Sequence, residues 1–179
     1  MKRIIFALLA ACIIFTLCSC GGDNNNVVAP EGTTYVENTI LKVSTCYPLG
    51  WTVDRNDGML SLLKDTSSST MVSTYASVSV TKYSTDKQSS TEYWEEYASR
   101  LESELKEYKL IEHKEIKIEK NTANQYHYTA KVDGDTYHFV QAIAVGGYSA
   151  YIITFTASEA DYETVVTDFN TIISNFSFK

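Results

Sequence analysis

The sequence predicts an α+β domain in which an antiparallel β-sheet of about six to seven strands is covered by two main helices. Three observations predict this class. Much of the chain after residue 33 alternates apolar and polar residues with the period of a β-strand. Residues 91–107 and 162–173 instead repeat apolar residues every three to four positions, as helices do. Asp133-Gly134 predicts a tight hairpin, which makes the strands that it joins antiparallel.

In the first half of the domain, strands are expected over residues 41–48, 51–53, 59–64 and 71–83. The turn Asn56-Asp57-Gly58 separates the second strand from the third, because Asn and Gly tolerate positive φ. In the last of these segments Tyr75, Ser77, Ser79 and Thr81 lie on one face and Ala76, Val78 and Val80 on the other.

A helix is expected over residues 91–107, because Ser89-Ser90-Thr91-Glu92 has the pattern of a capping box. Its apolar stripe consists of Tyr93, Tyr97, Leu101 and Leu105, widened by Trp94, Ala98 and Tyr108. Its charged residues, Glu95, Glu102, Lys106 and Glu107, are interpreted as a solvated face.

Strands over residues 116–119, 126–132, 137–143 and 148–156 complete the predicted sheet, with a turn at Gly146-Gly147. The Asp133-Gly134 hairpin pairs residues whose numbers sum to 267 and places Tyr137, Phe139, Gln141 and Ile143 on the face of Tyr126 and Tyr128. A second helix is expected to be capped by Ser158, and a short strand over residues 176–178 ends the chain.

The N-terminal segment has the pattern of a bacterial lipoprotein signal peptide over residues 1–19. Lys2 and Arg3 precede an almost unbroken apolar stretch, and the small residue Ser19 stands just before Cys20. Lipidation of Cys20, with acyl chains such as palmitate, would anchor the exported protein to the cell membrane or the outer membrane. Residues 20–32 then form a flexible polar spacer, and residues 33–179 form the globular domain.

Three alternatives to this interpretation were weighed. A transmembrane helix needs about 20 apolar residues, and the apolar stretch here is shorter. Cleavage as an ordinary secretory signal would leave Cys20 as an exposed thiol. Lipidation of Cys18 is disfavoured because Leu17 is too bulky for the position that precedes the cleaved bond.

Charge and cysteine content exclude several function classes. Removal of the leader takes away Lys2 and Arg3 and no acid, so the formal net charge changes from −7 to −9. An acidic domain repels phosphate backbones and anionic headgroups, which argues against nucleic acid as a partner.

Cys46 is the only thiol left once Cys20 is modified, so no intramolecular disulfide is possible, and we expect Cys46 to be buried. The 13 tyrosines are interpreted mainly as half-buried strand residues, with a ring-stacking surface as the alternative.

Two parts of the chain resemble PsbP-like domains. The first is Cys46-Tyr47-Pro48-Leu49-Gly50-Trp51-Thr52-Val53, which is similar to a "Tyr-Pro-x-x-Trp" string of that family. The second runs from Gly147-Tyr148 through Tyr151-Ile152-Ile153-Thr154-Phe155 and a capped helix to Phe176 and Phe178. The resemblance covers about residues 35–179 and implies a central antiparallel sheet covered by helices. It also implies a binding or assembly domain more than an enzyme.

Candidate chemistry is sparse. By the hairpin register His127 and His138 are diagonal neighbours on one side of the sheet, within reach of one metal ion, but two ligands are few and both could be partly exposed strand residues. No Gly-x-Ser-x-Gly elbow or Ser-His-Asp pattern is present, so we expect no catalytic residues and no cofactor. The leading hypothesis is a noncatalytic module that contacts another envelope protein. The alternatives are a small-ligand or glycan binder and, third, a hydrolase with an unrecognised His and carboxylate.

Overall fold

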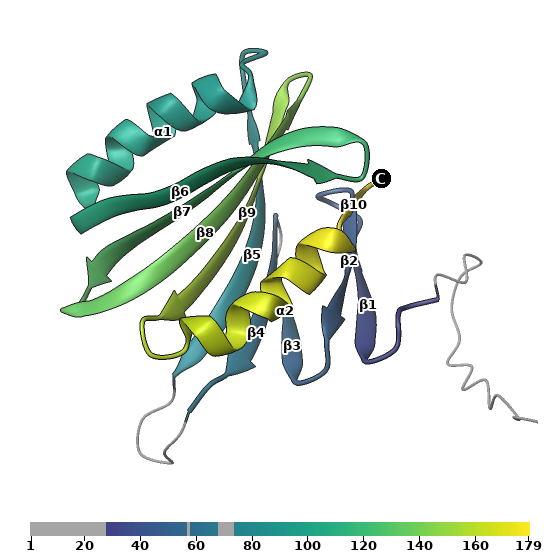
Figure 1. The fold of residues 1–179 in the computed structure, drawn as a ribbon. Coiled ribbons are helices and arrows are strands. Elements are labelled where there is room, and N and C mark those ends of the chain that lie inside the picture. Colours follow the sequence, from purple (N-terminus) through teal and green to yellow (C-terminus); the bar gives the residue numbers. More distant parts are fainter. Residues whose placement is uncertain (1–27, 57, 68–73) are drawn as a thin grey trace, which may run out of the picture.

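The computed structural model describes residues 28–56, 58–67 and 74–179 (Figure 1). Within these ranges the strands form a three-stranded and a seven-stranded sheet, accompanied by two helices. The elements in chain order are β1 (Thr33–Asn38), β2 (Val43–Pro48), β3 (Trp51–Asn56), β4 (Met59–Asp65), β5 (Tyr75–Ser84), α1 (Ser90–Glu104), β6 (Lys106–Ile118), β7 (Asn121–Val132), β8 (Asp135–Gly146), β9 (Ser149–Ser158), α2 (Tyr162–Ser174) and β10 (Ser177–Phe178).

The larger sheet is antiparallel throughout, with the strand order β3-β4-β5-β9-β8-β7-β6. The α+β class with an antiparallel sheet and two helices is therefore confirmed. The predicted hairpin register is confirmed as well, since Val132 pairs with Asp135 and His127 with Val140. Asp133 and Gly134 both have positive φ, as the tight turn requires.

Helix α2 packs on one face of this sheet. Its buried residues Val165, Phe169 and Ile172 belong to a core with Leu60, Leu62, Val78, Val80, Ile153 and Phe155. The small sheet, with strand order β1-β2-β10, contributes Val36 and Val43 to the same core. The Thr45 hydroxyl on β2 also donates to the backbone carbonyl of Ile172 at 2.8 Å. This core therefore joins both sheets and α2.

Helix α1 covers the other face, over the strands from β9 to β6 (Figure 1). Trp94 and Leu101 form a second core with Tyr126, Tyr128, Ile143 and Ile152. The Trp94 and Tyr126 rings stack with their centroids 3.7 Å apart and an interplanar angle of 7°. The residues of β7 and β8 alternate between the two cores, which is the face assignment that the hairpin register predicts.

The structure corrects two boundaries predicted from the sequence. Helix α1 ends at Glu104, not near residue 107, because the chain becomes extended at Leu105 and β6 begins at Lys106. The N-cap of α2 is Asp161, not Ser158; the Ser158 hydroxyl instead accepts from the Asp161 backbone N–H and donates to the Asp161 carboxylate. A register shift near Lys106 accompanies the early start of β6.

The strand patterns also differ in extent. Strand β1 was not predicted, and β6 is longer than the expected segment at residues 116–119. Strand β5 begins at Tyr75, and residues 71–73 of the predicted strand lie outside the described residues. The predicted signal peptide, Cys20 and the spacer up to residue 27 lie outside them too. No helix in the described part of the chain is long and apolar enough to cross a membrane.

Candidate functional site

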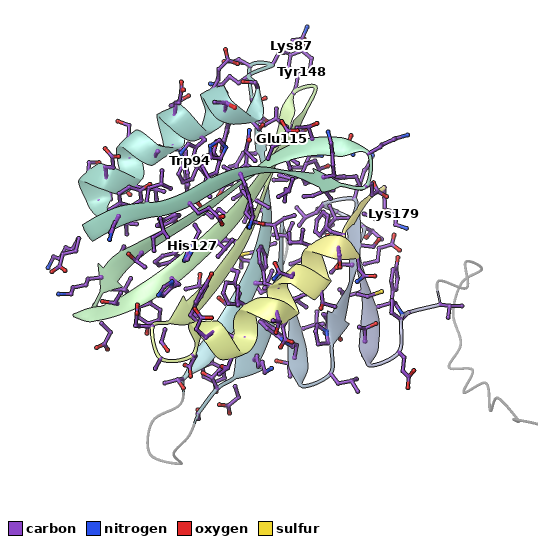
Figure 2. All side chains as sticks on the ribbon, in the orientation of Figure 1. Lys87, Trp94, Glu115, His127, Tyr148 and Lys179 are labelled. Carbon is purple, nitrogen blue, oxygen red and sulfur yellow. The ribbon has the colours of Figure 1, made fainter. Side chains whose placement is uncertain are left out.

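Helix α1 is held over the sheet by its first turn and by its apolar stripe. The Ser89 hydroxyl accepts from the Glu92 backbone N–H at 3.2 Å, while the Glu92 carboxylate accepts from the Ser89 backbone N–H at 2.7 Å. This is the predicted capping box. Trp94 points from the helix to the sheet (Figure 2). The neighbouring side chains Tyr93, Tyr97 and Arg100 border a space between the helix and β5.

Two neighbouring hollows make up this space. The upper part lies between the first half of α1 and the segment that leads from β5 into the helix, and its volume is about 310 Å³. The lower part lies between the second half of α1 and strands β5, β9 and β8, and its volume is about 300 Å³. Tyr83 and Tyr97 line both parts, so we describe them together as the α1 groove. Its volume is in the range of small-molecule sites.

Charged and ring-bearing side chains line the upper part. They are Tyr83, Asp86, Tyr93, Glu96, Tyr97 and Arg100. The Arg100 guanidinium lies 5.5 Å from the centre of the Tyr97 ring, and the Gln88 amide donates to Glu96 at 3.0 Å. Burial raises the pKa of Tyr93, and the neighbouring Tyr83 raises this pKa further while Arg100 lowers it. The Tyr93 hydroxyl is therefore a neutral hydrogen-bonding group at physiological pH.

The lower part has an apolar wall and a polar floor. Leu101 and Leu105 of α1 face Tyr128, Phe139 and Ile152 of the sheet. Burial raises the pKa of Tyr128 far above its ordinary value, so its phenol is also neutral. The floor carries Gln141, Thr154, Ser79 and Thr81.

Each part of the groove is lined by a residue that also carries a buried side-chain atom without a hydrogen-bond partner in the described part of the chain. In the lower part it is Gln141 Oε1, on a residue that is 3% exposed. The Gln141 Nε2 atom donates to Thr154 Oγ1 at 3.0 Å and lies 3.4 Å from the Tyr97 hydroxyl. In the upper part it is Thr85 Oγ1, on a residue that is 7% exposed. Such atoms are rare in folded proteins because their desolvation is uncompensated.

The groove floor continues as a row of polar residues across the sheet. Ser61 on β4 pairs with Ser79 on β5, which pairs with Thr154 on β9 and then Gln141 on β8. Ser61, Ser79 and Thr154 are half-buried. The adjacent pair, Ser77 and Thr156, lies on the same face because side chains alternate along a strand. A hydroxyl-bearing surface therefore extends from the groove over β5 and β4.

His127 and His138 are neighbours, as the register predicts. His127 Nε2 lies 2.8 Å from His138 Nδ1, and His138 Nε2 lies 2.7 Å from the Glu159 carboxylate. The carboxylate only accepts, so His138 donates from Nε2, while the direction of the hydrogen bond between His138 Nδ1 and His127 Nε2 is set by the protonation of the two rings. The Tyr162 ring stacks on both imidazoles, at centroid distances of 4.9 Å and 4.1 Å. Figure 2 shows His127 on the side of the sheet that α2 covers.

This histidine cluster links β7 and β8 to the start of α2. Burial lowers the pKa of His127, and His138 lowers it further. Glu112 and Glu163 raise the pKa of His127 and Lys114 lowers it, each by a smaller amount. One ring nitrogen of each histidine is engaged with the other histidine, and in residues 28–56, 58–67 and 74–179 no group of three or more His, Cys, Asp or Glu is placed to hold a metal ion.

The cluster also contains the convergent His and carboxylate that the hydrolase hypothesis requires. Glu159 was not singled out from the sequence, because it is distant from both histidines along the chain. None of the three side chains lines the α1 groove, which lies on the other face of the sheet. Cys46 is buried at 6% exposure, as expected, and does not line the groove.

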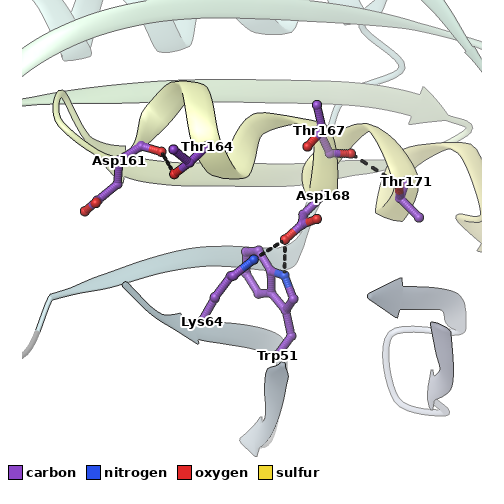
Figure 3. Close-up of polar contacts among 7 residues, drawn as sticks. All are labelled: Trp51, Lys64, Asp161, Thr164, Thr167, Asp168 and Thr171. Carbon is purple, nitrogen blue, oxygen red and sulfur yellow. Dashed lines mark hydrogen bonds and ion pairs between the residues drawn. The ribbon is translucent and has the colours of Figure 1, made fainter. Parts of the chain in front are cut away.

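Helix α2 is tied to β3 and β4 by one carboxylate (Figure 3). Asp168 accepts from the Trp51 indole N–H at 2.8 Å and from Lys64 Nζ at 2.7 Å. Trp51 is the tryptophan of the string that resembles PsbP-like domains. Its role here is structural, because it positions the helix that closes the α2 face.

The sheet order and the two helices define an α+β protein with a PsbP-like fold, and comparison with solved structures agrees. Cyanobacterial PsbP from Synechocystis sp. PCC 6803 matches with a TM-score of 0.61 and 15% identity, over 91% of this chain and 99% of that one. LpqN from Mycobacterium tuberculosis matches with a TM-score of 0.60 and 10% identity, over 76% and 83%. A Pseudomonas aeruginosa protein of unknown function matches with a TM-score of 0.56 and 16% identity, over 77% and 91%.

The chain belongs to the DcrB family, whose sequence model matches residues 56–175. This match runs from the end of β3 to the loop after α2 and therefore includes every residue that lines the α1 groove. No curated protein matches the sequence.

Proposed function

We propose that this protein is an exported, lipid-anchored and noncatalytic binding protein of the bacterial envelope, which binds another envelope component in the α1 groove. The observation that carries the proposal is the groove with its tyrosine rings and its floor of hydroxyl and amide side chains. Gln141 Oε1 and Thr85 Oγ1 have no partner within the described residues, yet each belongs to a residue that lines the groove.

The anchor is the acylated Cys20, which would hold the protein on the exported side of the cell membrane or the outer membrane. Residues 20–32 would act as a tether long enough to let the groove meet other envelope components. LpqN, which has a similar fold, is described as involved in cell envelope biogenesis, and this supports an envelope setting for the proposal.

The net charge of −9 after removal of the leader makes nucleic acid an unsuitable partner. Contact with another envelope protein was the leading hypothesis from the sequence, and a small ligand or glycan was the alternative. Both require a surface such as the α1 groove, and both are accessible to a crosslinking experiment in cells.

The experiment replaces Tyr83 by a photoreactive amino acid in the full chain and irradiates living cells. Tyr83 lies in both parts of the groove and is 51% exposed. Tyr75 lies at the other end of the same strand and is 52% exposed, so it is a matched control outside the groove. The proposal predicts a covalent adduct at position 83 that is absent or much weaker at position 75. Equal adduct yields at the two positions would contradict it.

A further inference from the structure

The side chains that line the α1 groove indicate which class of envelope molecule it binds. This step rests on the proposed function and concerns the chemistry of the occupant. Four properties bear on it: the rings at the groove walls, the polar atoms of the floor, the backbone of the strands and the charge around the groove.

The walls offer tyrosine rings at three positions. Tyr93 and Tyr97 stack on α1 with centroids 6.4 Å apart, and Tyr83 faces them from β5. A tyrosine presents an apolar ring face together with a polar hydroxyl. This combination suits a ligand whose rings carry C–H groups on their faces and hydroxyl groups on their edges.

The floor offers groups that hydrogen-bond in both directions. Ser79, Thr81 and Thr154 each carry a hydroxyl that can donate and accept. The Gln141 amide lies beside Thr154, and its contact with the Tyr97 hydroxyl, at 3.4 Å, is longer than an ordinary hydrogen bond. A ligand hydroxyl could therefore replace the Tyr97 hydroxyl there. In that position it would accept from Gln141 Nε2, as the Tyr97 hydroxyl does.

The backbone below the groove is closed to a peptide strand. Strand β5 is paired with β4 and β9, and β9 is paired with β5 and β8. Their backbone N–H and C=O groups are used within the sheet, so an extended peptide cannot bind here by adding a strand. Recognition in the groove has to come from side chains.

The charge around the groove disfavours an anion. Asp86 and Glu96 border the upper part, where Arg100 is the one basic residue that lines it and is positioned over the Tyr97 ring. An anionic polymer would meet these carboxylates as well as the net charge of −9 of the chain without its leader.

From these four properties we infer that the α1 groove binds a neutral oligosaccharide. The tyrosine rings contact the sugar rings, and the hydroxyls of the floor together with the Gln141 Nε2 group bind the sugar hydroxyls.

The test titrates the full-length lipidated protein, in detergent micelles, with chitotetraose, cellotetraose and maltotetraose, and measures binding by calorimetry. Saturable binding of at least one of these probes is expected. Tyr83→Ala should weaken it by about tenfold through loss of one ring contact. Tyr75→Ala should change the affinity by less than about twofold, because Tyr75 does not line the groove.

Gln141→Leu separates a binding role from a structural one. It removes the Oε1 atom that has no partner and also the hydrogen bond from Nε2 to Thr154, so the two effects on stability oppose each other and the melting temperature should change little, while oligosaccharide binding should weaken by about tenfold. Binding that survives Gln141→Leu and Tyr83→Ala unchanged would overturn the assignment to the groove.

The outcomes also separate this inference from the proposed function. If none of the three oligosaccharides binds while the Tyr83 photoprobe captures a protein, the glycan inference is wrong and the binding function stands. If neither the oligosaccharides nor the photoprobe give a specific signal, both are wrong.

Discussion

The indole N–H of Trp51 donates to the carboxylate of Asp168 at 2.8 Å, across 117 residues of sequence. Trp51 opens β3, and Asp168 lies in the middle of α2 (Figure 3). Lys64 binds the same carboxylate oxygen at 2.7 Å. One carboxylate therefore fixes the position of α2 relative to the edge of the larger sheet.

The indole hydrogen bond should contribute more to stability than the ion pair. Trp51 is 5% exposed, so Trp51→Phe removes a shielded hydrogen bond to a charged group, and we expect a loss of about 1.5–3 kcal/mol in the free energy of unfolding. Lys64 and Asp168 are more exposed, so Lys64→Met should cost less than about 1 kcal/mol. Urea denaturation measures both, and a larger loss for Lys64→Met would contradict this ranking.

The hairpin that joins β7 and β8 depends on a glycine. Gly134 has a φ of +99°, in the left-handed region where an L side chain is strained. We expect Gly134→Ala to lower the free energy of unfolding by about 1–2 kcal/mol. Gly146→Ala is the matched control, because Gly146 does not have positive φ and open space surrounds its Cα. Equal effects in thermal denaturation would show that the turn geometry is not the cause.

The histidine cluster makes stability depend on pH. The pKa of His127 is lower in the folded protein than its ordinary value, first through burial and then through His138. When the pH falls below that ordinary value, the unfolded chain binds a proton that the folded chain does not. The contribution of His127 is thus complete at higher pH and is lost as the pH falls through the folded pKa.

We therefore expect the wild-type chain to lose stability between about pH 7.5 and about pH 5.5, a range that lies above the ordinary carboxylate pKa values. His127→Gln retains a donor towards His138 but does not titrate, so its stability should fall less over the same range. Urea denaturation at a series of pH values gives both curves. Parallel curves would exclude His127 as the titrating group.

Lipid anchoring is tested at Cys20. Cys20→Ala should move the protein from the membrane fraction to the soluble exported fraction or leave the leader uncleaved, whereas Cys18→Ala should leave membrane attachment unchanged. Fractionation followed by mass spectrometry of the mature N-terminus measures both. Membrane attachment and an acylated cysteine that persist in Cys20→Ala would assign the anchor to another residue.

Local sequence patterns predicted the elements whose causes are local. The Ser89–Glu92 capping box and the Asp133-Gly134 turn each set their geometry within a few residues, and both are confirmed. The face shared by Tyr126, Tyr128 and Gln141 also followed from the register of one hairpin. The local pattern did not predict a boundary that depends on tertiary packing. The apolar stripe of the helix continues past Glu104 in the sequence, but the chain leaves the helix there and β6 begins at Lys106.

The candidate site was less predictable because its parts are distant in sequence. The groove forms where Tyr83 of β5 comes to face Tyr97 of α1, and this depends on β5 pairing with β9. Likewise, the sequence placed His127 beside His138 but could not place Glu159 next to them. The number of tyrosines was a signal, but their clustering around α1 is visible only in three dimensions.

Tyrosine footprinting in living cells tests the central claim most directly, because it uses the unaltered chain. Tyr83 and Tyr75 have nearly equal exposures of 51% and 52%, so a tyrosine-selective reagent should label them equally in the purified protein. If the α1 groove is occupied in the envelope, labelling in cells falls at Tyr83 and is unchanged at Tyr75. Equal labelling of the two residues in cells would contradict the proposal that the groove is the binding site.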